Sequence, residues 1–215
     1  MKKSVAVIGI GRFGISIAKE LYHNGCDVML LDQSSELVNE YAEDVTCAIS
    51  LDVRDAKALE EAGIGDMDVV VTSMSDHLEA TIMAIITSKS LGVPHIIAKA
   101  KDFVTGTILE KIGADTVVYP EQEAGIRLCQ KIISDNFIDY FNISDTSSLV
   151  EIYPKEEWIG KSLRELELRK KYKMNVVAIM QKDDFNIAMD PDEPLKKEEK
   201  LLITIKKKDL NKLKS

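Results

Sequence analysis

The sequence predicts an α/β protein, with a doubly wound parallel sheet followed by a small α+β domain. Short apolar runs rich in Val and Ile alternate with helix-length amphipathic segments, which is the pattern of parallel β-α units. A cluster of turn-forming residues, "NISDTSS" at 142–148, then interrupts this periodicity. With 215 residues and 45% hydrophobic content, the chain can bury one good core and a second, smaller one. We therefore expect two domains, at 1–140 and 141–215.

The first domain holds six predicted strands, at residues 4–8, 28–31, 45–49, 69–72, 96–99 and 116–119. Segments between them, such as 78–91 and 104–112, place apolar residues three and four apart, so each forms a helix with a stripe that covers the sheet. A last helix is expected at about 121–137.

The second domain is expected to contain a strand, a helix and two more strands. These are "SLVEIYP", "SLRELELRKKYK", "NVVAIMQ" and "KLLITIK", with "MDPDEPL" as a proline-marked loop. About 70 residues of this kind make a marginal core. We therefore expect the second domain to rely on a partner.

The first predicted strand leads into glycines in a G-x-G-x-x-G spacing. Gly9 permits a tight turn, Gly11 lets the backbone approach a phosphate, and Gly14 lets the helix pack close to the sheet. Asp32 stands at the end of the next strand, where a carboxylate can accept both ribose hydroxyls. This combination predicts a Rossmann-type nucleotide site and disfavours NADP, because Asp32 would repel a 2′-phosphate.

Other residues at the carboxyl ends of the strands are candidates for the same site. Arg12 carries a permanent charge that can meet a terminal phosphate, although a solvated arginine in a first helical turn is the plainer interpretation. Asp52 and the stretch 72–76 follow the third and fourth strands, where such sheets bind ligands. Asp52 is equally a candidate cap for the helix that starts near Asp55.

Charge argues against nucleic acid as a partner. Residues 1–140 carry 12 Lys and Arg against 22 Asp and Glu, and residues 141–215 carry 16 against 14. An acidic first domain repels a phosphate backbone, although a local pocket can still take a nucleotide. We expect no nucleic acid binding.

The sequence offers little reactive chemistry. All three histidines, His23, His77 and His95, lie in the first domain, and the chain has no nucleophile elbow, Walker lysine motif or His/Cys metal cluster. A hydride-transfer enzyme usually needs an acid or base from its second domain. The sequence therefore favours nucleotide binding for regulation and a protein that is not an enzyme. An NAD-dependent oxidoreductase with a small accessory domain, and a stand-alone nucleotide sensor, stay open as alternatives.

Cysteine usage indicates a reducing compartment. Cys26, Cys47 and Cys129 are far apart and fit no metal or redox spacing, so we expect them to be reduced and mostly buried. No stretch approaches the roughly 18 apolar residues of a membrane span. We expect a cytoplasmic protein.

The stretches "AVIGIGRFG", "LEKIGADTVVYPE" and "IGKSLRELELRKKYKMNVVAI", together with Asp32, resemble the regulatory subunits of Ktr and Trk potassium uptake systems. These are RCK proteins, regulators of potassium conductance, with an N-terminal Rossmann domain and a small C-terminal domain. One departure lies after the third strand, where the family often has a Gly-Asp/Asn-Ala-Thr/Ser turn. Here that turn reads Leu51, Asp52, Val53 and Arg54.

The resemblance implies a homodimer that assembles into an octameric ring on a separate membrane potassium-translocating subunit, so that the protein is peripheral to the membrane through this partner. ATP and ADP, or NAD and NADH, would bind at the glycine loop, with Arg12 sensing the γ-phosphate. Glu121 would coordinate Mg²⁺ or Ca²⁺, although an acid after Pro120 is also a common helix start. The implied nucleotide contacts are Gly9, Gly11, Arg12, Phe13, Gly14, Asp32, Gln33, Asp52, Val53, Thr72, Ser73, Lys99 and Glu121.

For the small domain, the resemblance implies a receptor for cyclic di-AMP. The matching residues are Leu163, Leu168, Arg169, Asn175 and Pro191. Arg169 and the two lysines after it can meet phosphates, but a basic run late in a helix is also what the helix dipole favours without a ligand.

Overall fold

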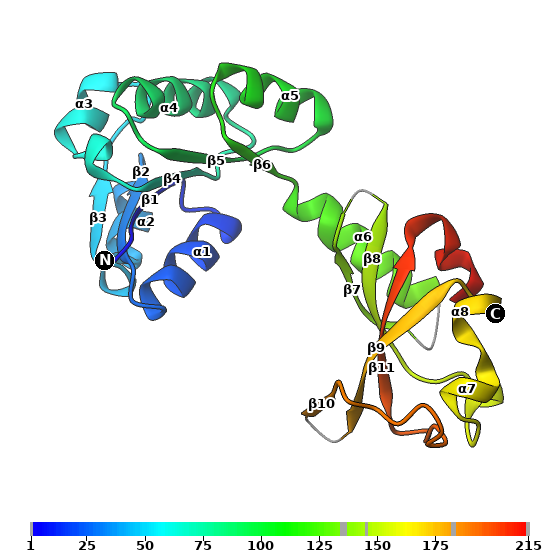
Figure 1. The fold of residues 1–215 in the computed structure, drawn as a ribbon. Helices are drawn as coiled ribbons and strands as arrows, with labels where there is room; N and C mark the ends of the chain where they lie inside the picture. Colours follow the sequence, from blue (N-terminus) through cyan, green and yellow to red (C-terminus); the bar gives the residue numbers. More distant parts are fainter. Residues whose placement is uncertain (1, 134–136, 145, 182–183, 214–215) are drawn as a thin grey trace. The chain divides into compact units, whose positions relative to one another are not determined.

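The chain forms two compact units in the computed structural model, which describes residues 2–133, 137–144, 146–181 and 184–213 (Figure 1). The first unit is Met1–Gln122 and the second is Glu123–Ser215. Each unit has a sheet of its own.

The first unit contains a six-stranded parallel sheet in the order β3-β2-β1-β4-β5-β6. This is the strand order of a Rossmann fold, in which the order of strands along the sheet reverses between β1 and β4 and leaves a crevice at their carboxyl ends. The doubly wound sheet predicted from the sequence is confirmed. The strands are β1 (Ser4–Ile8), β2 (Asp27–Asp32), β3 (Cys47–Ser50), β4 (Val69–Thr72), β5 (His95–Lys99) and β6 (Thr116–Val118).

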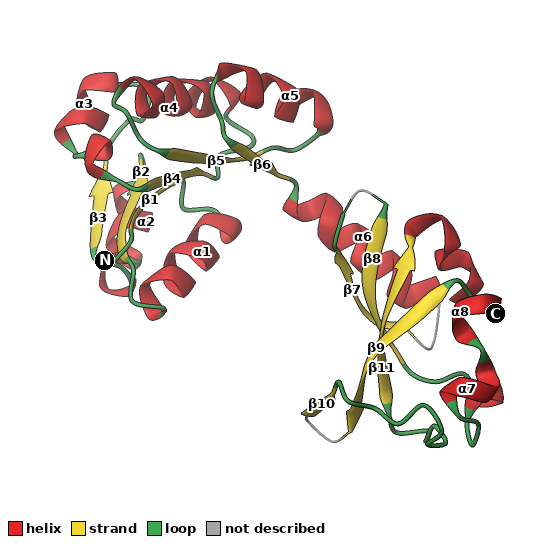
Figure 2. Ribbon diagram, viewed as in Figure 1, coloured by secondary structure: helices red, strands yellow, loops and turns green. Residues whose placement is uncertain are grey.

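Helices cover both faces of this sheet (Figure 2). Alternate strand residues point to opposite faces, so Val5 and Val7 of β1 pack in one core cluster with Ala18 of α1 (Arg12–His23). Helix α2 (Ser35–Glu40) covers the same face through a buried valine. Ala6 and Ile8 pack in the other cluster with α3 (Ala56–Glu61), α4 (Leu78–Ser90) and α5 (Phe103–Ile112). Two 3₁₀ turns, Ala42–Asp44 and Ile64–Asp66, complete the unit.

The second unit is built on an antiparallel sheet in the order β10-β9-β11-β8-β7 (Figure 1). Its core contains Trp158, Met174 and Leu201, all essentially inaccessible to solvent. A small α+β domain is thus confirmed. Its elements are α6 (Pro120–Ile133), which starts in the first unit, β7 (Phe137–Asn142), β8 (Ser147–Ile152), a 3₁₀ turn (Glu156–Trp158), α7 (Leu163–Leu166), α8 (Leu168–Lys171), β9 (Met174–Gln181), β10 (Asp184–Asn186), β11 (Lys200–Lys206) and a 3₁₀ segment (Lys207–Leu213).

The division between the units differs from the expected boundary at 140/141. Strand β7 pairs with β8, with Tyr140 opposite Val150 and Phe141 opposite Leu149, so residues before 140 already belong to the second sheet. The expected helix to 137 was also wrong in its end, because α6 is described to Ile133 and residue 137 lies in β7. Residues 134–136 of that predicted helix lie outside the described part of the chain.

The predicted helix at 162–173 is two short helices. Glu167 separates α7 from α8 with a left-handed φ of 47°. Every residue of "LRELELRKK" is a good helix former, so the interruption comes from packing: Leu166 and Leu168, on either side of the break, are both buried in the core of the second unit. The strands β7 and β10 and the terminal 3₁₀ segment are absent from the sequence-based prediction.

Candidate functional site

The glycine loop follows β1 at the carboxyl edge of the parallel sheet. Gly9 has a φ of 101°, and its N–H donates to the Leu31 carbonyl at 2.8 Å. A Cβ at Gly9 would lie 2.6 Å from Cγ of Met74 and 2.9 Å from Oγ of Ser73. Both the backbone conformation and the lack of space therefore require glycine at this turn.

The other two glycines play different parts. A Cβ at Gly14 would lie 2.1 Å from the Gly9 carbonyl oxygen, so Gly14 lets α1 start against the end of β1. A Cβ at Gly11 would meet no atom within 4 Å. Gly11 is exposed at the N-cap of α1, where free N–H groups and the helix dipole favour an anion.

Asp32 joins this loop to the end of β2. Its Oδ2 accepts from the Ile10 N–H at 2.7 Å, and its Oδ1 accepts from the Ser34 N–H at 2.9 Å. These two bonds fix the carboxylate in position beside the glycine loop. Each oxygen keeps further acceptor capacity, which suits the two hydroxyls of a ribose.

A cavity of about 400 Å³ lies along the glycine loop. Lys99 reaches it from the end of β5, with Nζ 2.6 Å from Oε1 of Glu121 and 5.6 Å from the centre of the Phe13 ring. The Lys99 ammonium, by hydrogen bonding, lowers the pKa of Glu121. The lining residues are Gly9, Ile10, Gly11, Arg12, Phe13, Asp32, Ser73, Met74, Ser75, Asp76, His77, Lys99 and Glu121.

Arg12 is the first residue of α1 and is exposed at this cavity. Within the described part of the chain, its guanidinium pairs with no carboxylate, whereas Lys99 is committed to Glu121. Arg12 is therefore a cation beside the glycine loop whose charge no carboxylate of the described residues offsets.

A divalent ion at Glu121 would find few protein ligands. Among the residues that the structure describes, no group of three His, Cys, Asp or Glu side chains is placed to hold a metal. Glu121 provides one carboxylate, and Lys99 already neutralises it. The remaining ligands would have to come from a bound phosphate or water.

A second cavity, of about 390 Å³, adjoins the first and shares Asp32, Met74 and His77 with it. Asp55 caps α3 by accepting from the Lys57 and Ala58 N–H groups, so the alternative role of Asp52 as that cap is wrong. The lining residues are Asp32, Gln33, Leu51, Asp52, Val53, Arg54, Met74, His77, Leu78, Glu79 and Ala80.

Asp52 makes an ion pair with Arg54 at the mouth of this second cavity. The Asp52 carboxylate accepts from Nε of Arg54 at 2.9 Å and from Nη2 at 2.6 Å. Hydrogen bonds from the Arg54 side chain and backbone lower the pKa of Asp52 to about 2.

Eleven of the thirteen residues predicted for the nucleotide site line one of the two cavities. Gly14 and Thr72 do not, because Gly14 is packed against the Gly9 carbonyl and Thr72 is wholly buried at the end of β4. Met74, Ser75 and Asp76, from the candidate stretch 72–76, also line the cavities, whereas the prediction missed Ile10, Leu51, Arg54 and the lining residues from His77 to Ala80. Their position after β1, β3 and β4 was the available signal, because ligands of such sheets bind at the carboxyl ends of strands.

The second unit has a cavity of about 330 Å³ on α7, α8 and β9. It brings together Leu163, Leu168, Arg169 and Asn175, four of the five residues predicted for cyclic di-AMP. Lys170, one of the two lysines expected to meet phosphates, also lines it, and the prediction missed Glu167, Met174 and Val176.

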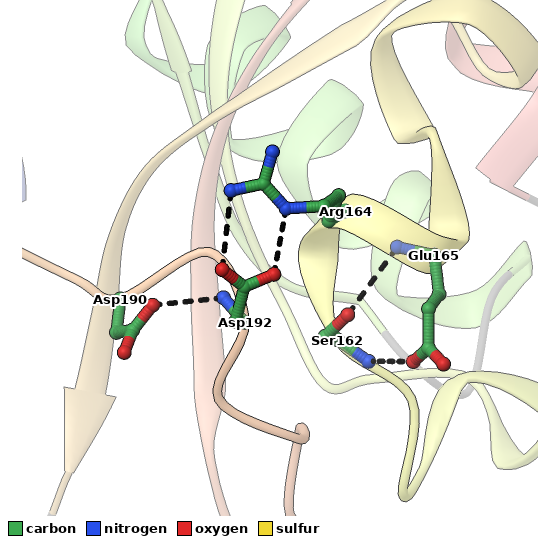
Figure 3. Close-up of polar contacts among 5 residues, drawn as sticks. All are labelled: Ser162, Arg164, Glu165, Asp190 and Asp192. Carbon is green, nitrogen blue, oxygen red and sulfur yellow. Dashed lines mark hydrogen bonds and ion pairs between the residues drawn. The ribbon is translucent and has the colours of Figure 1, made fainter.

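Pro191 does not line this cavity, but its loop is tied to α7 (Figure 3). The Arg164 N–H donates to the Pro191 carbonyl at 3.0 Å. The Arg164 side chain binds both carboxylate oxygens of Asp192, at 2.6 and 3.1 Å, and this contact lowers the pKa of Asp192. Ser162 and Glu165 form a reciprocal capping box at the start of the same helix.

The free cysteines differ from expectation. Cys47 and Cys129 are exposed and Cys26 is partly buried; Cys47 lies on the edge strand β3, and Cys129 lies on α6, which is exposed from Glu121 to Cys129. The expectation that they are mostly buried was wrong. In the part of the chain that the structure describes, no helix is both long and apolar enough to span a membrane.

The strand order, the glycine loop answered by Asp32, and the small antiparallel unit define a Rossmann-type protein of the nucleotide-binding class with a C-terminal accessory domain. The TrkA-N domain model matches residues 5–120, and the TrkA-C domain model matches residues 148–215. The first match alone covers more than half of the chain.

Comparison with known proteins agrees with these domains. The chain is 36% identical to Ktr system potassium uptake protein C of Bacillus subtilis (strain 168), over 94% of this chain and 92% of that protein. It is 33% identical to Ktr system potassium uptake protein A of the same organism, over 97% and 94%. The chain therefore belongs to the Ktr and Trk family of potassium uptake regulatory subunits.

A solved structure shows the same fold. The GsuK channel bound to NAD matches with a TM-score of 0.66 and 16% identity, over 99% of this chain and 39% of that one. The RCK domain of GsuK matches with a TM-score of 0.64. This chain thus corresponds to less than half of those longer chains, and the likeness establishes an RCK fold.

Proposed function

We propose that this protein is a cytoplasmic, non-enzymatic gating subunit of a bacterial potassium channel or transporter, and that it responds to ATP and ADP or to NAD and NADH. The observation that carries the proposal is the continuous pair of cavities from the open face of Gly11 to Asp52. Together they offer a phosphate site, a ribose acceptor and a pocket with both polar and apolar lining, in a member of a potassium uptake family.

Discrimination between ATP and ADP is assigned to Arg12. Both nucleotides share the contacts of the glycine loop and Asp32, and equal binding shifts no equilibrium between two conformations. Arg12, whose charge is offset by no carboxylate in the described part of the chain, would supply a contact for the γ-phosphate alone. Glu121 would add a divalent ion once Lys99 is displaced, with the nucleotide phosphates as the other ligands.

Calorimetric titration with ATP, ADP, NAD and NADH tests this assignment. Arg12→Ala is expected to lower ATP affinity by roughly 1.5–3 kcal/mol and to leave ADP affinity within a few tenths. Glu121→Gln is expected to make ATP binding insensitive to Mg²⁺ and Ca²⁺. Equal losses for ATP and ADP in the Arg12 variant would mean that this residue supports the loop and does not read the third phosphate.

The oxidoreductase alternative makes the opposite prediction about turnover. The GsuK structure that contains NAD is that of a channel, so NAD is also bound by a protein of that class. His77 is the one histidine among the residues that line the two cavities. Purified protein with NADH and a panel of carbonyl substrates is expected to show no oxidation above background. Steady turnover would overturn the regulatory proposal.

Assembly into a homodimer, and further into an octameric ring, is proposed from the exposed apolar residues of α6. Ile126, Leu128, Ile132 and Ile133 are all exposed, and Ile132 exposes 74% of its surface. A helix with so many exposed apolar side chains is typical of an interface. Light scattering is expected to give a dimer or larger, and a concentration-independent monomer would contradict the proposal.

A membrane potassium-translocating subunit of the Ktr or Trk type is the proposed partner, and it would hold this protein at the inner face of the membrane. The names of the relatives support this, since they are potassium uptake proteins. Vesicles that contain such a subunit should retain the protein, and potassium flux through them should differ between ATP and ADP. Equal flux with both nucleotides would argue against gating.

Cyclic di-AMP is the proposed ligand of the second unit. Arg169 and Lys170 supply positive charge to its cavity, and Leu163, Leu168 and Val176 supply apolar surface for a base. Titration with cyclic di-AMP tests the site directly. A lack of binding to the intact protein would remove it.

A further inference from the structure

Arg54 is held at one geometry by a single carboxylate. The Asp52 Oδ1 accepts from the Arg54 backbone N–H at 3.0 Å and from Nε at 2.9 Å, while Oδ2 accepts from Nη2 at 2.6 Å and from Nε at 3.1 Å. The same turn is closed by the Asp55 N–H, which donates to the Asp52 carbonyl at 3.0 Å. Backbone and side-chain bonds together therefore fix the direction of the guanidinium.

The turn itself has little freedom. Val53 is 5% exposed and packs into the core between the sheet and helices α3, α4 and α5. Asp55 is the N-cap residue of α3. The ion pair nevertheless faces solvent, since the Arg54 and Asp52 side chains are 51% and 45% exposed. Because this arginine is already ordered before a ligand binds, it loses less side-chain conformational entropy on binding.

The cavity that Arg54 lines combines apolar side chains with polar ones, among them Gln33, His77 and Glu79. Leu51, Val53, Met74, Leu78 and Ala80 supply apolar surface, and Arg54 supplies a flat cation. Both Asp52 oxygens are already engaged by Arg54. Asp52 is thus poorly placed to be the main acceptor for a base, and its contribution passes through the arginine.

We propose that Arg54 is a base-binding residue, whose guanidinium stacks on the purine of the bound nucleotide, and that Asp52 is the residue that positions it. Guanidinium groups stack well on flat aromatic rings, and a larger ring offers a larger face. The inference rests on the proposed nucleotide site and adds to it a preference for purine over pyrimidine bases.

A simpler interpretation makes the ion pair a brace that holds the turn before α3. The two interpretations differ in one measurable quantity. A brace supports every nucleotide equally, because ribose and phosphates depend on the same edge of the sheet. A stacking residue supports purines more than pyrimidines.

The experiment measures the affinities of ADP, GDP and UDP for the wild-type protein and for Arg54→Met, Arg54→Lys and Asp52→Asn. Lys57→Met is the matched control, because it removes one positive charge from the same segment and Lys57 does not line the cavity. Arg54→Met is expected to weaken ADP and GDP binding about five- to tenfold and UDP binding less than twofold. Arg54→Lys is expected to resemble Arg54→Met, because it keeps the charge and loses the plane.

The role of Asp52 is tested in the same series. Asp52→Asn is expected to lower purine affinity in the wild-type background and to add little in the Arg54→Met background, because its effect passes through Arg54. Loss of equal size for all three nucleotides, or full rescue by Arg54→Lys, would overturn the stacking role. Absence of ADP binding to the wild-type protein would instead overturn the proposed nucleotide site itself.

Discussion

The first unit holds its cavities at the carboxyl ends of parallel strands, where the Asp32 carboxylate accepts a hydrogen bond from the Ile10 N–H of the glycine loop. The second unit holds its cavity on two four-residue helices, α7 and α8, which meet at Glu167 in a left-handed conformation. One site thus follows from the topology of a sheet, and the other from a local break in a helix.

Backbone conformation separates the two units in the same way. Within the described residues, every residue of the first unit with a positive φ is a glycine, and these are Gly9, Gly25, Gly63, Gly92 and Gly113. The second unit places Glu167 and Lys173 in this region, at φ values of 47° and 59°. Non-glycine residues adopt this conformation at a cost in free energy. The cavity of the second unit therefore depends on a backbone that tertiary packing must hold in place.

The largest expected effect comes from a glycine that lies directly against the backbone of the first unit. Gly14→Ala would place a Cβ 2.1 Å from the Gly9 carbonyl oxygen, and a backbone atom cannot move away as a flexible side chain can. We expect a loss of stability of about 3 kcal/mol or more, confined to the first unit. Urea unfolding followed by far-ultraviolet circular dichroism measures the whole chain, while Trp158, the only tryptophan, reports the second unit by fluorescence.

Gly11→Ala is the matched control for this change. Its Cβ meets no atom within 4 Å, and its φ of −88° is open to alanine, so stability should change by less than about 1 kcal/mol. Nucleotide binding should still weaken, because the new methyl group stands where a phosphate approaches. A Gly14→Ala protein as stable as the wild type would break the contrast between a topological and a local site.

The same contrast explains what the sequence could predict. Gly9, Gly11, Gly14 and Asp32 have a fixed spacing because a strand, a turn and a helix must meet a second strand, and the six strands follow from runs of buried residues. The split at Glu167 has no such signal, since the surrounding residues all favour helix and only the burial of Leu166 and Leu168 decides. The prediction missed Arg54 because its side chain reaches the cavity through a hydrogen bond back to Asp52, two residues earlier, and no sequence pattern indicates this bond.

The next largest effect is expected from Arg169→Ala, which changes the cavity of the second unit. Arg169 lines this cavity on α8, and loss of a charge-assisted hydrogen bond to a phosphate should weaken cyclic di-AMP binding by about 1.5–3 kcal/mol. Lys171→Ala removes a charge from the same short helix outside the lining residues and should change affinity much less. Equal losses in the two variants would indicate general attraction of an anion in place of a built site.

Lys173→Gly should stabilise the second unit. The φ of 59° at Lys173 suits glycine, so relief of strain should exceed the added freedom of the unfolded chain by about 0.5–1 kcal/mol. Urea unfolding followed by Trp158 fluorescence measures the change. Lys171→Gly, placed inside α8, should instead destabilise by up to about 1 kcal/mol. Destabilisation by both changes would mean that position 173 is not strained.

The smallest expected effect is the loss of the Asp52–Arg54 ion pair at low pH. Measuring it tests whether the turn before α3 depends on this side-chain contact. Hydrogen bonds from Arg54 lower the pKa of Asp52 from 3.8 to about 2 in the folded protein. The contribution of the pair is therefore complete above pH 3.8 and disappears as the pH falls through about 2, because the unfolded chain takes up the proton first. In Arg54→Met the side-chain donor is gone while the N–H of residue 54 remains, so the pKa of Asp52 should rise towards 3.8 without reaching it.

Carbon-13 shifts of the Asp52 carboxyl group, followed against pH, measure the titration midpoints of the wild type and of Arg54→Met, with Lys57→Met as the control. Equal midpoints in the wild type and in Arg54→Met would mean that the arginine side chain does not hold this carboxylate in solution. The turn would then depend on its backbone bonds, unlike the glycine loop, where the Asp32 carboxylate holds the Ile10 N–H.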